Sequence, residues 1–93
     1  MTDDLQYFDG LESVELTIGA NAYEVQALRR PLAPRLSGGT QIDRAAWHVR
    51  ADDLASDVPI VGNTLTAGAE TWTAVEVERL SFGTRYRLVC ERL

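Results

Sequence analysis

Apolar and polar residues alternate along much of this chain, which is the pattern of β-strands with one buried face. The alternation is clear at residues 14–18 and again at residues 23–27. A glycine and an asparagine lie between these segments, and both residue types tolerate the positive φ angles of a tight turn. We predict an antiparallel hairpin here, with Ile18 opposite Tyr23.

A second hairpin is predicted from residues 71–80 and 85–92. The register that places Glu76 opposite Arg87 pairs opposite charges and collects apolar residues on the other face. Trp72 falls on the opposite parity from those apolar residues, which leaves two alternatives. Either a bulge beside it turns the indole inward, or the indole stays outside as part of an interface.

The middle of the chain adds two short alternating segments, residues 47–51 and 62–66, separated by a possible helical turn with an aspartate cap. Residues 31–44 are predicted to form a long flexible loop, because they contain two prolines and a Gly-Gly pair. The predicted fold is all-β: one domain over residues 1–93, with five to six strands in a small antiparallel β-barrel or β-meander. Closure of such a sheet would remove its reactive edges.

The net charge of −5 is unevenly distributed along the 93 residues. Residues 1–28 carry six acids and no basic residue, residues 29–50 carry five arginines against one aspartate, and residues 51–93 carry seven acids against four arginines. Lysine is absent. The acidic and basic stretches could meet inside the fold, or between copies of the chain arranged head to tail.

The residues with catalytic potential form no recognisable constellation. The single histidine, His48, lies on the polar face of its predicted strand, and no second histidine or cysteine stands at ligand spacing. The single cysteine, Cys90, lies on an apolar face; its lack of a partner fits a reducing compartment. We therefore expect no enzymatic activity, no metal and no cofactor.

Four arginines in or beside the predicted loop, Arg29, Arg30, Arg35 and Arg44, have no acidic partner in the predicted strand pairing. Arginine suits phosphate contacts, but the domain is acidic and the loop has no aromatic residue for base stacking. Docking on an acidic protein surface is therefore favoured over DNA contact through the loop.

The second half of the chain resembles the small phage head–tail joining proteins, which include tail-attachment, connector and stopper proteins. The resemblance is carried by residues 47–54 (WHVRADDL), Pro59, residues 61–65 (VGNTL) and residues 68–72 (GAETW) with Val75. These match a strand, an acidic turn, a "G-D-T-L" strand entry and a "G-x-x-aromatic-x-V" strand. Asn63 stands where that pattern has aspartate.

The resemblance implies a structural protein of a phage or prophage particle that forms or joins a ring at the portal vertex. Its implied partners are copies of itself and a portal or neighbouring connector or tail protein, with no membrane. The implied location is the cytoplasm during assembly and then the virion. The alternative is a generic small bacterial β-barrel module that binds a protein or nucleic acid. The candidate interface residues are Arg29, Arg30, Arg35, Arg44, Trp72 and Phe82.

Overall fold

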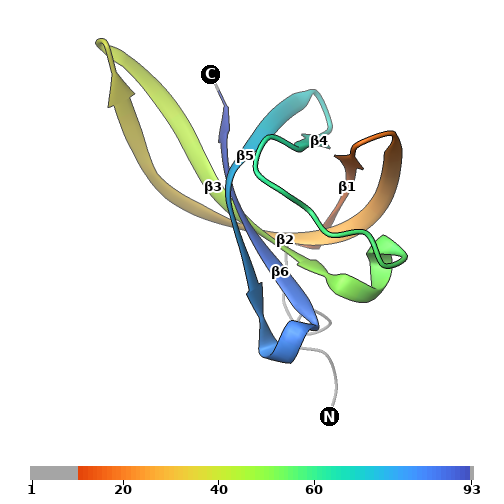
Figure 1. Cartoon of the computed structure of the whole chain (residues 1–93). Helices are drawn as coiled ribbons and strands as arrows, with labels where there is room; N and C mark the ends of the chain where they lie inside the picture. The colour runs from red at the N-terminus through yellow and green to blue at the C-terminus, as the bar shows by residue number, and fades with distance from the viewer. Residues whose placement is uncertain (1–10, 93) are drawn as a thin grey trace.

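The computed structural model describes residues 11–92 and confirms the all-β prediction (Figure 1). All strand pairs are antiparallel, in the order β1-β2-β3-β6-β5-β4, and β1 also pairs with β4 to close the sheet. The strands are β1 (Leu11–Ile18), β2 (Asn21–Ser37), β3 (Thr40–Arg50), β4 (Thr64–Ala67), β5 (Glu70–Leu80) and β6 (Arg85–Arg92).

The first predicted hairpin exists, but its register differs from the prediction by two residues. Tyr23 lies opposite Leu16 rather than Ile18, because the turn contains only two residues and begins at Gly19 with φ +59°. Two-residue turns of this kind match the twist of paired strands. Since side chains alternate with a period of two, the shift changes the partners but keeps the same face buried.

The second hairpin is also shifted by two residues, so that Arg87 lies opposite Glu78 instead of Glu76. A bulge between Ala74 and Glu76 changes the alternation of β5, so that Trp72 faces the same side of the sheet as the apolar residues after the bulge. The indole is turned inward and is only 3% exposed. The bulge alternative is thus confirmed, and the prediction of Trp72 as an exposed interface residue is wrong.

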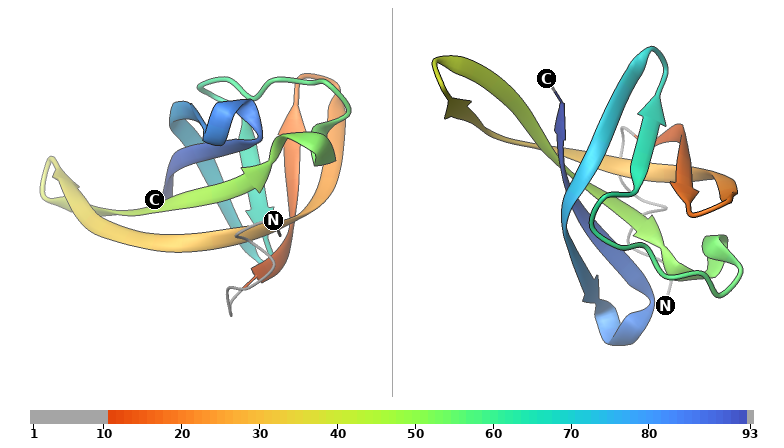
Figure 2. Two further views of the ribbon diagram at one scale, coloured as in Figure 1. Left: turned by 90° about the horizontal axis from the view of Figure 1, so that it is seen from below. Right: turned by 45° about the horizontal axis from the view of Figure 1, so that its top comes forward.

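The predicted long loop at residues 31–44 is wrong, because β2 and β3 remain paired almost to their connecting turn at Gly38 and Gly39. Within residues 11–92, no strand pairs with β2 beyond Leu28 on its β1 side, and an edge position of this kind tolerates Pro31 and Pro34. A register shift also occurs between Leu32 and Arg35. Residues 32–42 form a two-stranded projection, which we call the arm (Figures 1 and 2).

The interior of the closed sheet is filled by apolar residues from all six strands. Trp47 and Trp72 meet edge to face, with ring centroids 6.0 Å apart. Such aromatic pairs add about 0.5–1.5 kcal/mol beyond their buried area. Leu88 and Leu54 are fully buried in the same core. This core fixes the base of the arm, since Trp47 belongs to β3.

Helical structure in residues 11–92 consists of the short turns η2 (Ala51–Leu54) and η3 (Ser81–Gly83). The predicted aspartate cap is wrong: η2 starts after Arg50 and has no side-chain cap. Neither turn approaches the length or apolar character required of a membrane-spanning helix.

Candidate interaction site

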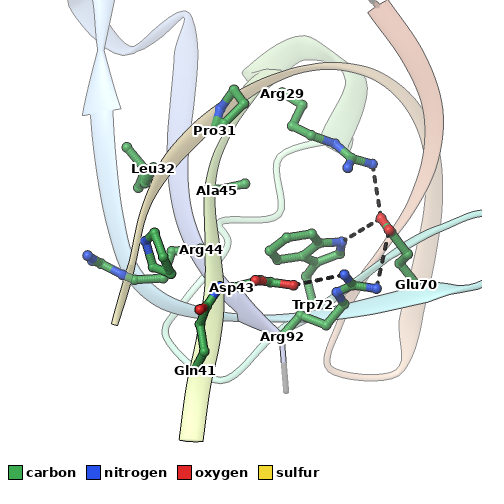
Figure 3. A pocket seen from close by; sticks show the side chains of 11 residues that line it. Arg29, Pro31, Leu32, Gln41, Asp43, Arg44, Ala45, Glu70, Trp72 and Arg92 are labelled. Atoms are coloured by element: carbon green, nitrogen blue, oxygen red, sulfur yellow. Dashed lines mark hydrogen bonds and ion pairs between the residues drawn. The ribbon is translucent and has the colours of Figure 1, made fainter. Parts of the chain in front are cut away.

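An open cavity of about 300 Å³ lies at the base of the arm, bordered by β2, β3, β5 and β6 (Figure 3). Its floor is Trp72, and prolines of β2 form part of its wall. Three arginines and two carboxylates line it, so the charged groups at its surface have a net charge of +1. The lining residues are Arg29, Pro31, Leu32, Pro34, Gln41, Asp43, Arg44, Ala45, Glu70, Trp72 and Arg92.

Glu70, at the start of β5, joins three donors of this cavity (Figure 3). Arg29 donates from Nη2 to Oε1 at 3.1 Å, and the Trp72 indole Nε1 reaches the same oxygen at 3.4 Å. Arg92 Nη1 lies 3.2 Å from Oε2. One carboxylate thus binds two guanidinium groups that approach it from different strands.

The same arginines cover the aromatic floor. The guanidinium of Arg29 lies 4.6 Å from the ring centroid of Trp47 and 5.7 Å from that of Trp72. Arg92 lies 5.3 Å from Trp72. Cation–π contacts of this kind contribute about 0.5–2 kcal/mol, depending on desolvation. Arg29 also donates to Glu12 at 3.0 Å, which connects β2 to β1.

A second ionic cluster attaches the arm to β6. Arg35 binds Glu91 through two hydrogen bonds of 2.9 and 2.8 Å, and Arg44 Nε lies 3.4 Å from the same carboxylate. The hydrogen bonds from Arg35 lower the pKa of Glu91, and the charges of Arg35 and Arg44 act in the same direction. Arg92 donates to Asp43 at 3.0 Å. The arm is therefore fixed to the body on its β3–β6 side.

These contacts correct the expectation that the arginines at 29–44 lack acidic partners. Arg29, Arg35 and Arg44 are paired with carboxylates of β5 and β6 as well as β1. Arg29 and Arg44 meet at the cavity, whereas Arg30 is exposed on the alternate face of β2. Phe82 is fully exposed on η3, away from the cavity. The predicted site residues thus do not form one surface.

Sequence reasoning missed Glu70, Glu91 and Arg92, which complete the cavity and its ionic clusters. Their partners lie 41, 56 and 49 residues away in sequence, and no periodicity connects them. The exposed apolar residues Ile60 and Val61 were also missed. A weak signal for these was available, because residues 58–61 place three branched apolar residues in a segment with no strand alternation.

Burial shifts the pKa values of the single cysteine and the single histidine in opposite directions. Burial raises the pKa of the Cys90 thiol to about 12, so the thiol is protonated at neutral pH. His48 is partly buried rather than exposed on a polar face, and burial lowers its pKa, with further lowering by Arg85, Arg87 and Arg30. Within residues 11–92, no three His, Cys, Asp or Glu side chains are grouped to hold a metal.

Comparison with known proteins identifies no relative: no family model matches the chain, and no curated protein matches it significantly.

Proposed function

We propose that this protein is a structural assembly subunit of a phage or prophage particle, of the head–tail joining type. It acts without catalysis, as one copy in a ring at the portal vertex. The observation that carries the proposal is the arm, residues 32–42, which extends from a small closed sheet (Figures 1 and 2). A two-stranded projection on a compact body is suited to reaching a neighbouring subunit.

The residues that carry the sequence resemblance add support. They run from the end of β3 through η2, the following loop and β4 into β5, and in the closed sheet β6 lies between β3 and β5. Asn63 stands at the position where the related pattern has aspartate. Its Oδ1 accepts a hydrogen bond from the Ile60 amide at 2.7 Å, which stabilises the turn. An aspartate carboxylate could accept the same bond, so the substitution preserves the turn.

Phe82 is the candidate contact with a portal or neighbouring connector protein. Its ring is fully exposed, and its backbone has φ +57°, which is unfavourable for a side chain of this size. An apolar ring at the tip of a turn suits insertion into a pocket on a partner.

The proposal is tested by measuring binding to a purified portal ring, with the Phe82→Asn variant for comparison. The variant relieves the backbone conformation, so lost binding cannot be attributed to unfolding. We expect binding by the natural sequence and at least tenfold weaker binding by the variant, which corresponds to about 1.4 kcal/mol. A chain that binds neither portal nor connector proteins, at low or high salt, would refute the proposed function.

A second candidate function, a β-barrel module that binds nucleic acid, is favoured by one observation. His48 on β3 lies among Arg30, Arg85 and Arg87, whose charges all lower its pKa. Arg87 is also within 3.7 Å of Glu76, which reduces the positive potential of this face. A DNA mobility shift that weakens steeply between 50 and 200 mM salt would support this alternative.

A further inference from the structure

The loop between η2 and β4 exposes a group of apolar side chains. Val58, Ile60 and Val61, which we call the apolar loop, point largely into solvent; Ile60 is 60% exposed. Val75 is turned outward by the β5 bulge, and the adjoining Ala74 exchanges backbone hydrogen bonds with the end of the same loop. A group of large apolar side chains exposed together marks an interaction surface more often than a scattered single residue does.

The apolar loop is held in place by the body. Pro59 is fully buried between the exposed residues. Asp57 accepts hydrogen bonds from Asn21 and from the hydroxyl of Tyr23 on β2. The amide of Gly62 donates to Ala74 at 2.8 Å. A surface fixed in this way loses little conformational entropy when it binds.

The arm tip carries the other apolar side chain relevant here, Leu36, which is 74% exposed. The arm tip and the loop of residues 55–63 lie on different sides of the body in each view (Figures 1 and 2). One molecule therefore cannot bring its own Leu36 onto its own apolar loop. Two different surfaces on one chain are the requirement for head-to-tail association.

Charge favours contact between these two unlike surfaces. The segment before the apolar loop contains Asp52, Asp53 and Asp57, of which Asp53 is paired with Arg50 at 3.4 Å, and Glu24 is exposed beside Tyr23. Arg35 is the charged residue of the arm, and it lies with Arg44 of β3 and Glu91 of β6 in a cluster whose two cations and one anion leave a net charge of +1. Loop against loop would bring acidic rims together, which opposes symmetric pairing.

We propose that the apolar loop of one copy binds the arm tip of a second copy, with Leu36 packed against Ile60 and its neighbours. The inference rests on the proposed ring assembly, whose subunit contact it specifies. The two ends of the contact differ, so each bound copy keeps one free surface of each kind. Repetition of the contact produces a ring if the rotation closes and a filament if it does not.

The contact is tested by disulfide trapping between separately purified Leu36→Cys and Ile60→Cys chains. Both positions are exposed, and the natural Cys90 is buried in the core, so oxidation targets the introduced thiols. The two chains are mixed in equal amounts at high concentration under mild oxidation, and disulfide-linked peptides are quantified by mass spectrometry. A mixture of Leu36→Cys with Phe82→Cys is the control, because Phe82 is more exposed than Ile60 and accessibility alone would favour the 36–82 disulfide.

We expect the 36–60 disulfide to exceed the 36–36, 60–60 and 36–82 disulfides by about tenfold, the ratio for 1.4 kcal/mol of preferential contact. Equal yields of all pairs would overturn the proposed contact, even if the protein binds a portal. A dominant 36–60 disulfide in a chain that binds no portal or connector would support the contact and refute the head–tail function. A dominant 60–60 product would show symmetric pairing instead.

Discussion

The carboxylate of Glu70 is expected to be the main electrostatic support of the arm base, and Glu70→Gln tests this. The substitution keeps the shape of the side chain but removes its charge. Arg29 and Arg92 then lose the anion that they share across Trp72. The cost should appear as reduced global stability, because these residues join β2, β5 and β6.

The magnitude follows from the two ion pairs. Glu70, Arg29 and Arg92 are each about one-third exposed, which places each pair near the upper end of the range for surface ion pairs, about 0.5–1 kcal/mol. Loss of both pairs should lower the free energy of unfolding by about 1–2 kcal/mol. In a domain of this size, a loss of 1 kcal/mol lowers Tm by about 4–8 °C.

The assay is urea unfolding followed by tryptophan fluorescence, with thermal unfolding as a second measurement. The matched control is Glu78→Gln, whose carboxylate is more exposed and lies 3.6 Å from Arg87; it should cost less than about 0.5 kcal/mol. A double-mutant cycle with Arg29→Gln should give a coupling of about 0.5–1 kcal/mol. If Glu70→Gln costs no more than the control, or if the coupling is zero, the reasoning is refuted.

Three further predictions concern single residues. Phe82→Asn should raise the unfolding free energy by about 0.5 kcal/mol, because asparagine tolerates the positive φ angle; a lower Tm would contradict this. The pKa of Glu91 is lowered in the fold, so its stabilising contribution is present above its ordinary pKa of 4.5 and is lost as pH falls through the folded value. Glu91→Gln should therefore flatten the decrease in stability measured by urea unfolding below about pH 5, and an unchanged slope would count against the Arg35 contact. Cys90, with its pKa raised to about 12, should resist thiol reagents at pH 8 in the folded protein and react after unfolding; rapid labelling of folded protein would refute its burial.

The sequence predicts which segments form hairpins, and which of their faces are buried, better than it predicts which residues lie opposite each other. Alternation identified the buried faces of both hairpins, because burial depends on parity and a two-residue slip preserves parity. It did not select between registers two residues apart. That choice depended on the turn at Gly19 and the bulge after Ala74, and on packing around Trp72 in the closed sheet.

The candidate site was less predictable than the fold, since its contacts join distant parts of the chain. Arg35 and Glu91 are 56 residues apart, and they meet only because β3 lies between β2 and β6. The prolines at 31 and 34 indicated a loop when considered locally. They are compatible with a strand because this part of β2 is an edge among the described residues, and edge position is a property of the whole sheet.

The paired state of the arm changes the energetics expected for assembly. A flexible loop would become ordered only on contact with a partner, and part of the interaction energy would offset that ordering. The arm already has its backbone paired, and Arg35 and Arg44 hold it to Glu91. The conformational entropy of the arm is therefore lost when the chain folds and the sheet closes, and not when a partner binds. A single apolar side chain at its tip, Leu36, can then contribute to binding with little entropic loss. We therefore expect the ion pairs of Arg35 and Arg44 with Glu91 to position the arm for assembly, rather than to form the surface that a partner binds.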